Sequence, residues 1–123
     1  MNLNRNIHVL SITLVWLMFT PVWTAAGEAP SIEQGKKLYF LEQVNTKGVT
    51  MSCTTCHTSN PKEKGKTKAN KIIEPMAPII NPERFTDVAK TEKWFKRNCN
   101  DVLDRECTQT EKDSFILYMK SIK

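Results

Sequence analysis

Residues 51–60 read "MSCTTCHTSN", and the five residues 53–57 within them, CTTCH, decide the fold. Two cysteines separated by two residues, with a histidine directly after the second, have the spacing of c-type haem attachment. Each thiol adds across one vinyl group of the porphyrin, and the next residue then lies beneath the iron, where its imidazole binds. The spacing therefore predicts one covalently bound haem c, with Cys53 and Cys56 as its attachment points and His57 as an axial ligand.

Two other uses of the cysteines compete with haem. A CxxC pair acts as a redox dithiol in thioredoxin-like proteins, but it follows a strand of a βαβ unit there, and no such unit is predicted here. Cys53, Cys56, Cys99 and Cys107 together supply four thiolates for zinc, although the seven-residue gap between the last two is wide for a zinc knuckle. We favour haem because His57, the only histidine outside residues 1–26, directly follows the CxxC pair.

Residues 1–26 are typical of a secretory signal peptide. Arg5 gives a basic start, residues 7–22 are mostly apolar, and Ala26 ends a run of small residues that a signal peptidase reads. The apolar part is short for a membrane span, and an uncleaved N-terminal anchor is the alternative. Cleavage after Ala26 predicts a periplasmic protein, residues 27–123, in a compartment where covalent cysteine chemistry persists.

The remaining 97 residues (123 less 26) suit one small domain. So short a chain buries too little apolar surface on its own and usually depends on a disulfide, a metal or a cofactor. Haem meets this need, because its porphyrin offers a large apolar body around which the chain can pack.

The positive charge is concentrated in one stretch. Without Arg5 the chain has 17 basic and 13 acidic side chains, a net charge of +4, and residues 61–71 contain five lysines and one glutamate. The run from Lys62 to Lys71 is either a solvated loop or a docking patch for an acidic redox partner. Nucleic acid is not expected as a partner of an exported chain with no aromatic residue in this stretch.

Capping signatures predict three helices in an all-α domain with long loops. Ser31 with Gln34 begins a helix through about Gln43, Thr86 caps one to about Asn98, and Thr108 with Glu111 begins one that ends near Ile122. Residues 44–52 are predicted to be a loop. Residues 61–82 are predicted to have little regular structure, and residues 72–82, "IIEPMAPIINP", form a proline-rich strap.

The apolar positions of these helices predict the core. Gly35 is expected to let another helix approach closely, because it has no side chain. The candidate core residues recur at helical spacing: Leu38, Tyr39, Leu41, Val88, Phe95, Cys99, Phe115, Tyr118, Met119 and Ile122.

The residues leave the ligand opposite His57 open. Met51 is too close to Cys53 to reach around the ring, and Met119 belongs to a helix face that is typical of core. Met76 lies in the strap, where it serves either as a thioether ligand or as an apolar wall residue. Asn98 lies at the predicted end of a helix, where asparagine is common because it tolerates left-handed backbone.

Three stretches, "SCTTCHTSNPKEKGK", "IEPMAPIINPERFTDVAKTEKWFKRNCN" and "VLDRECTQTEKDSFILYM", resemble the sphaeroides haem protein family of monohaem class I cytochromes c. The resemblance extends from about Gly35 over nearly all of the chain. Its most specific parts are the Asn98-Cys99 pair, the Arg-x-Cys-Thr sequence that ends at Thr108, and the turn of residues 85–87.

This resemblance implies a class I cytochrome c fold of about five helices around one covalent haem. It also implies that His57 and Asn98 are the axial ligands, that Cys99 and Cys107 form a disulfide, and that the reduced protein binds O2 and NO. A dihaem cytochrome c or a membrane cytochrome b is implied as electron donor. Met76 departs from the founding member of the family, which has a leucine at this position, so a thioether is available to compete with Asn98.

Three functions follow as hypotheses. In the first, a periplasmic cytochrome accepts an electron, loses Asn98 as a ligand and binds O2 or NO. In the second, Met76 is a permanent sixth ligand and the protein is an ordinary electron carrier. In the third, the protein is an enzyme that turns over O2 or NO, which ligand binding permits but does not demonstrate.

Overall fold

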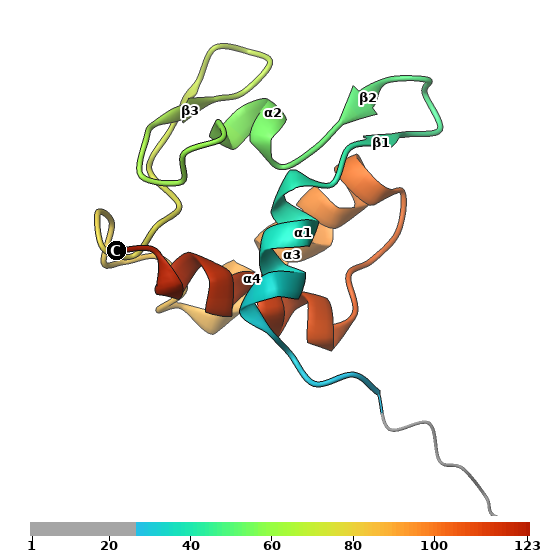
Figure 1. Ribbon diagram of the computed structural model, residues 1–123. Coiled ribbons are helices and arrows are strands. Elements are labelled where there is room, and N and C mark those ends of the chain that lie inside the picture. Colours follow the sequence, from blue (N-terminus) through green and yellow to red (C-terminus); the bar gives the residue numbers. More distant parts are fainter. Residues whose placement is uncertain (1–26) are drawn as a thin grey trace, which may run out of the picture.

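The computed structural model describes residues 27–123, which form four α-helices and two short antiparallel ladders (Figure 1). The predicted signal peptide lies outside the described residues. In chain order the elements are α1 (Ile32–Phe40), β1 (Gln43–Val44), β2 (Thr50–Met51), α2 (Thr54–His57), β3 (Gly65–Lys66), β4 (Ile72–Ile73), α3 (Val88–Leu103) and α4 (Gln109–Ser121). No helix within residues 27–123 has the length and apolar character that a membrane span needs.

The prediction of a small all-α domain with long loops is confirmed, with one helix fewer than the five expected. The long segment between β4 and α3 forms turns, because three prolines at positions 75, 78 and 82 interrupt it. The predicted loop of residues 44–52 contains three of the four residues of the β1–β2 ladder, in which Gln43 pairs with Met51 and Val44 with Thr50. In Figure 1, α2, β2 and β3 lie above the three longer helices, and β1 lies beside the upper ends of α1 and α3.

α1 and α4 are packed closely because of two small residues. A Cβ atom on Gly35 would lie 1.9 Å from the Ser114 carbonyl oxygen, so the predicted close approach is confirmed and only glycine fits there. The Ser114 hydroxyl accepts a hydrogen bond from the Ser31 amide (3.1 Å) and donates one to Gln34 Oε1 (3.0 Å). Ser31 Oγ caps Gln34 N as predicted (3.2 Å), but Gln34 bonds to Ser114 and does not complete a capping box. α1 ends at Phe40, three residues before the predicted end.

α3 differs most from its prediction. Its N-cap is Asp87, whose carboxylate accepts from the Lys90 amide (2.9 Å), whereas the Thr86 hydroxyl donates to the Glu83 carbonyl. The helix continues five residues past Asn98 and ends where Asp104 takes a left-handed conformation (φ 54°). Asn98 is therefore inside the helix and not at its end.

An aromatic cluster joins α1, α3 and α4. Phe115 of α4 meets Phe95 of α3 edge to face at 5.6 Å between ring centroids, and Tyr39 of α1 at 6.0 Å. The predicted core is confirmed for the buried residues Tyr39, Phe95, Cys99, Phe115 and Met119, and for the half-buried residues Leu38, Tyr118 and Ile122. It is wrong for Leu41, which follows the end of α1, and for Val88, which is 73% exposed in the first turn of α3.

The predicted capping box of α4 is confirmed. Glu111 N donates to Thr108 Oγ1 (3.2 Å), and Thr108 N donates to Glu111 Oε2 (2.8 Å). α4 ends at Ser121 with Ile122 as its C-cap, close to the predicted end.

Candidate haem site

The CxxCH motif folds as a single helical turn. Cys53 has α-helical backbone angles and immediately precedes α2, which ends at His57. Residues three and four positions apart share one side of a helix, so both cysteines and the histidine lie on the same side of this turn. Cys53 and Cys56 are free thiols. The two thiols and the imidazole that the sequence predicts for haem attachment therefore lie within one helical turn.

Burial sets the protonation of these groups. It raises the pKa of the Cys53 thiol to about 11. It also lowers the pKa of His57 to about 4, with the positive charge of Arg84 as a smaller cause. The imidazole is thus neutral near pH 7, and a neutral ring nitrogen has the free lone pair that a metal ligand needs. The chemistry of these residues fits a covalently attached haem.

Tyr39 fixes the end of residues 53–57, the candidate haem-binding turn (hereafter the haem-binding turn). Its buried hydroxyl donates to the carbonyl oxygens of Thr58 (2.8 Å) and His57 (3.3 Å). Thr58 has a positive φ of 63° and turns the chain at the end of α2. From the sequence, Tyr39 is predicted only as a core residue. A buried tyrosine hydroxyl regularly has a hydrogen-bond partner, and this tendency is the signal that could have pointed to its contact with the turn.

Gly65 of β3 packs directly on the same turn. A Cβ atom at this position would lie 1.9 Å from the Cys56 carbonyl oxygen and 3.0 Å from His57 Cα. Only glycine therefore allows β3 to lie this close to α2. No motif in the sequence points to Gly65, and the only available signal is a glycine within a lysine-rich run.

The strap is held against the core by its own backbone. The amides of Met76 and Ala77 both donate to the Pro61 carbonyl (2.9 and 3.0 Å). Arg84 Nε donates to the Pro75 carbonyl (2.8 Å). Met76 is buried, with 8% of its surface exposed, and belongs to the apolar core. The alternative sixth ligand thus occupies the position of a wall residue.

Asn98 has a different environment from Met76. It is exposed on α3, next to the buried Cys99 and one turn after Trp94 on the same flank. Within residues 27–123, its carboxamide makes no hydrogen bond with a protein group, whereas Asn100 Nδ2 donates to the Lys96 carbonyl (2.6 Å). The Asn98 side chain is therefore available to a ligand or a metal.

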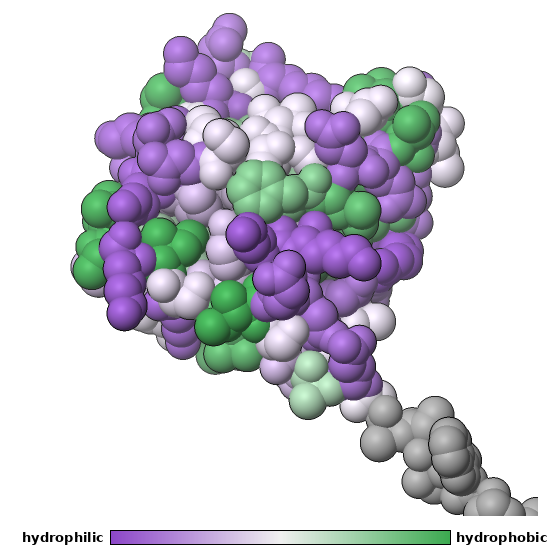
Figure 2. Space-filling view, viewed as in Figure 1, coloured by the Kyte–Doolittle hydropathy of each residue, from purple (hydrophilic) through white to green (hydrophobic). Residues whose placement is uncertain are grey.

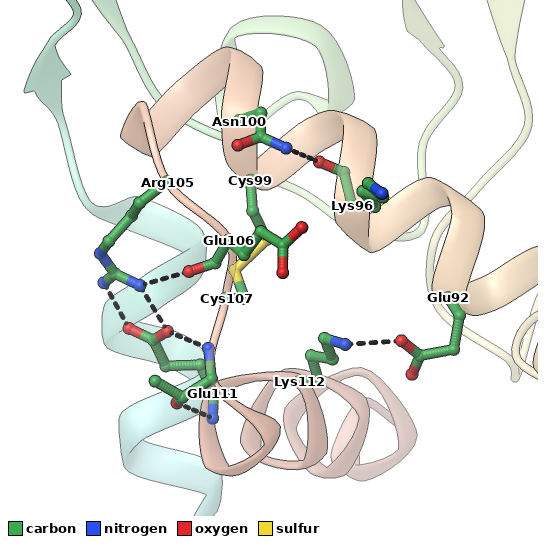
Figure 3. Close-up of a disulfide and its surroundings, with 10 residues drawn as sticks. Glu92, Lys96, Cys99, Asn100, Arg105, Glu106, Cys107, Glu111 and Lys112 are labelled. Atoms are coloured by element: carbon green, nitrogen blue, oxygen red, sulfur yellow. Dashed lines mark hydrogen bonds and ion pairs between the residues drawn. A yellow bond between two sulfur atoms is a disulfide. The ribbon is translucent and has the colours of Figure 1, made fainter.

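Cys99 and Cys107 are joined by a disulfide between α3 and the segment before α4 (S–S 2.00 Å; Figure 3). Beside it, an ion pair joins Lys112 of α4 to Glu92 of α3. The residues described hold no group of three or more His, Cys, Asp or Glu placed to bind a metal ion. Cys99 and Cys107 are thus not available as thiolates, and the arrangement does not support the four-thiolate zinc alternative.

Apolar side chains are also available around these elements. Ile79 and Ile80 of the strap and Trp94 of α3 are all at least 45% exposed. Figure 2 shows apolar patches separated by hydrophilic side chains on the face in view. Large exposed apolar groups suit contact with a flat apolar body such as a porphyrin.

Known proteins resemble this chain in sequence. Residues 25–119 match a family described as a domain of unknown function, DUF1924. The chain is 43% identical over 95 residues to cytochrome c-type protein SHP of Cereibacter sphaeroides, covering 77% of this chain and 74% of that protein. It is 42% identical over 93 residues to cytochrome c'' of Methylophilus methylotrophus, covering 75% of this chain and 65% of that protein.

Solved structures of the same two relatives also resemble this chain. The crystal structure of oxidised cytochrome c'' from Methylophilus methylotrophus matches with a TM-score of 0.70 at 40% identity, covering 78% of this chain and 79% of that one. The structure of oxidised SHP, an oxygen-binding cytochrome c, matches with a TM-score of 0.69 at 42% identity, covering 73% and 80%. A solution structure of cytochrome c'', concerned with haem-ligand detachment, matches with a TM-score of 0.67 at 41% identity, covering 77% of each chain.

Proposed function

We propose that this chain, which belongs to the DUF1924 family and to the SHP-like monohaem cytochromes c, is a gas-binding redox protein and not a plain electron carrier. As a c-type cytochrome it carries one covalently bound haem c, which Cys53, Cys56 and His57 would hold. When bound, the haem supplies an iron that takes up one electron and coordinates small molecules. The protein's residues decide which ligands reach that iron.

His57 is proposed as the permanent axial ligand and Asn98 as the one opposite. The observation that carries this assignment is the free Asn98 carboxamide, which lacks a protein partner in the described chain although it adjoins the disulfide at Cys99. Met76, by contrast, is packed in the core.

Asn98 is proposed to leave when the protein is reduced. A carboxamide oxygen is a neutral, hard donor, which suits ferric iron better than ferrous iron. The released side chain keeps two N–H donors with which it can stabilise an incoming O2 or NO molecule. Two relatives support this reading, because one is described as an oxygen-binding cytochrome c and another through haem-ligand detachment.

The proposed location is the periplasm, and the proposed electron donor is a dihaem cytochrome c or a membrane cytochrome b. The lysines of the run from Lys62 to Lys71 are all exposed, although Lys64 is paired with Glu74 (2.9 Å). Because β3 lies against α2, this positive surface adjoins the haem-binding turn. An acidic partner would be drawn to it at low ionic strength and less strongly at high ionic strength.

The test compares the wild type with two variants. Carbon monoxide added to the reduced wild type is expected to change its absorption spectrum, because Asn98 has vacated the sixth position. Asn98→Ala is expected to alter the oxidised spectrum and electron paramagnetic resonance signal, whereas Met76→Leu leaves both unchanged. Two results together would favour an ordinary electron carrier with Met76 as the sixth ligand. The absorption spectrum of the reduced wild type would not change on addition of carbon monoxide, and the oxidised spectrum would change in Met76→Leu but not in Asn98→Ala.

A further inference from the structure

A hydrogen-bonded clasp joins the C-terminal end of α3 to the β1–β2 hairpin. The Thr46 amide donates to Asp104 Oδ2 (2.6 Å), and the Thr46 hydroxyl donates to Asp104 Oδ1 (3.1 Å). Both carboxylate oxygens are therefore used by one residue that is 58 positions away in the sequence. Hydrogen bonds to a charged acceptor are stronger than neutral ones, so this contact holds more firmly than its exposed position suggests.

Hydrogen bonds around Asn45 connect the turn that contains Thr46 to β2. Asn45, which is 8% exposed, accepts hydrogen bonds on its side-chain oxygen from the amides of Lys47 (3.1 Å) and Val49 (3.0 Å). Its own amide donates to the Val49 carbonyl (3.0 Å). The Asn45 side chain also donates to Met51 Sδ (3.6 Å) in β2. The turn and β2 are thus one hydrogen-bonded unit.

This unit leads directly into the haem-binding turn. Only Ser52 separates Met51 from Cys53, and the buried Ser52 donates its amide to Thr55 Oγ1 (2.9 Å) of α2. On the other side of the clasp, Asp104 follows the last residue of α3, six positions after Asn98. The clasp therefore connects the segment that carries Cys53 and His57 to the helix that carries Asn98.

We propose that Asp104 is a positioning residue that fixes α3, and with it Asn98, relative to the CxxCH turn in the oxidised protein. The inference rests on the proposed role of Asn98 as a detachable ligand. His57 is placed by its own chain next to the attachment cysteines, but Asn98 depends on where α3 lies. Because a carboxamide is a weak ligand, a small displacement of α3 shifts its bound fraction strongly.

The backbone at Asp104 permits clean variants. Its φ of 54° is left-handed, a conformation that glycine and asparagine accept readily. Asp104→Gly therefore removes both acceptors without backbone strain, and Asp104→Asn keeps one acceptor. Thr46→Val removes the hydroxyl donor from the other side. Asp101→Ala is the matched control, because it removes an exposed acidic side chain of α3 that pairs with Arg97 and not with the hairpin.

The experiment uses the haem-containing protein and two measurements. In Asp104→Gly, hydrogen exchange of the Thr46 amide is expected to be at least tenfold faster, and the oxidised protein is expected to show a several-fold larger high-spin fraction by electron paramagnetic resonance. Asp104→Asn and Thr46→Val should give smaller changes in the same direction, and Asp101→Ala none. An unchanged high-spin fraction in Asp104→Gly and Thr46→Val, or an unchanged Thr46 exchange rate, overturns the inference.

Asn98→Ala, measured alongside, separates the two possible failures. If Asn98→Ala changes the oxidised spectrum and Asp104→Gly does not, the clasp inference alone fails. If Asn98→Ala leaves the oxidised spectrum unchanged, the proposed ligation itself is wrong, and the inference fails with it.

Discussion

At the scale of single residues, the haem-binding turn depends on two contacts that lie outside the CxxCH motif. Tyr39 holds the carbonyls of His57 and Thr58, and Gly65 allows β3 to pack on Cys56. Both contacts act on the backbone of the turn and not on its chemically active side chains. The backbone of the motif is thus held in part by residues that lie outside it.

Gly65→Ala is expected to disturb haem attachment. The added Cβ atom would collide with the Cys56 carbonyl, and overpacking of this kind typically costs about 1–3 kcal/mol. We predict a lower haem content per protein, measured by the pyridine haemochrome assay, and a lower midpoint of thermal unfolding.

The control for this prediction is Gly48→Asn. Gly48 has a φ of 71°, which asparagine tolerates, and nothing lies within 4 Å of its added Cβ position. Equal haem content and stability in Gly65→Ala and Gly48→Asn would contradict the importance of the β3–α2 contact.

The sequence predicts the chemically active residues of this turn but not their supports. The positions of Cys53, Cys56 and His57 depend on spacing within one helical turn, so a local pattern is sufficient. The contact of Gly65 depends on how the chain returns to α2 after residue 60, and no local pattern encodes that path. Asn98 and Met76 remain the two candidates for the sixth ligand. Asn98 is exposed and Met76 is buried, and this difference depends on packing that no local sequence pattern encodes.

At the scale of elements, capping predicts where helices begin better than where they end. The capping box of α4 and the serine cap of α1 are local signals, and both start their helices as predicted. α3 continues beyond Asn98 because asparagine is tolerated within a helix, and because Val102 and Leu103 extend its buried face by another turn. The helix ends only where Asp104 adopts left-handed backbone and its carboxylate meets the hairpin.

The stability that the start of α4 contributes to the fold is expected to depend on pH. Arg105 hydrogen bonds lower the pKa of Glu111 to about 2, from an ordinary value of 4.5. The folded-state pKa is depressed, so this stabilisation is fully present above about pH 5 and is lost as the pH falls through 4 towards 2. Because Arg105 is half exposed, solvent screening limits the contribution to roughly 1 kcal/mol.

Urea unfolding between pH 2 and 7 tests this expectation. In Glu111→Gln, the free energy of unfolding should be lower than in the wild type at pH 6, and the difference should shrink towards pH 2. Glu33→Gln, which changes an exposed acidic residue in the first turn of α1, is the control. A difference between Glu111→Gln and the wild type that is the same at pH 2 and pH 6 would show that the Arg105 pair is not its source.

At the scale of the whole molecule, a small core surrounds the aromatic cluster while several large apolar side chains stay exposed. The buried set is centred on Phe115, and Trp94, Ile79 and Ile80 lie outside it. A domain of this size buries a modest share of its surface, which is why covalent haem is expected to be part of its stability. The fold class was predictable because chain length, the CxxCH spacing and three helical patterns agree.

Removing the covalent haem is expected to weaken the entire domain. In the double variant Cys53→Ala/Cys56→Ala, we predict broad, weakly cooperative thermal unfolding. We also predict brighter fluorescence from Trp94, the one tryptophan of residues 27–123, because haem no longer quenches it. Unfolding as sharp as that of the wild type would contradict a structural role for the haem.

The central claim is that Asn98 binds the iron in the oxidised protein and leaves on reduction. Resonance Raman spectroscopy of the wild type in both oxidation states tests it most directly, because the porphyrin bands report coordination number and spin state. The account predicts six-coordinate, mainly low-spin iron when the protein is oxidised, and five-coordinate, high-spin iron when it is reduced. A six-coordinate, low-spin spectrum in the reduced state, unchanged in Asn98→Ala, would contradict it.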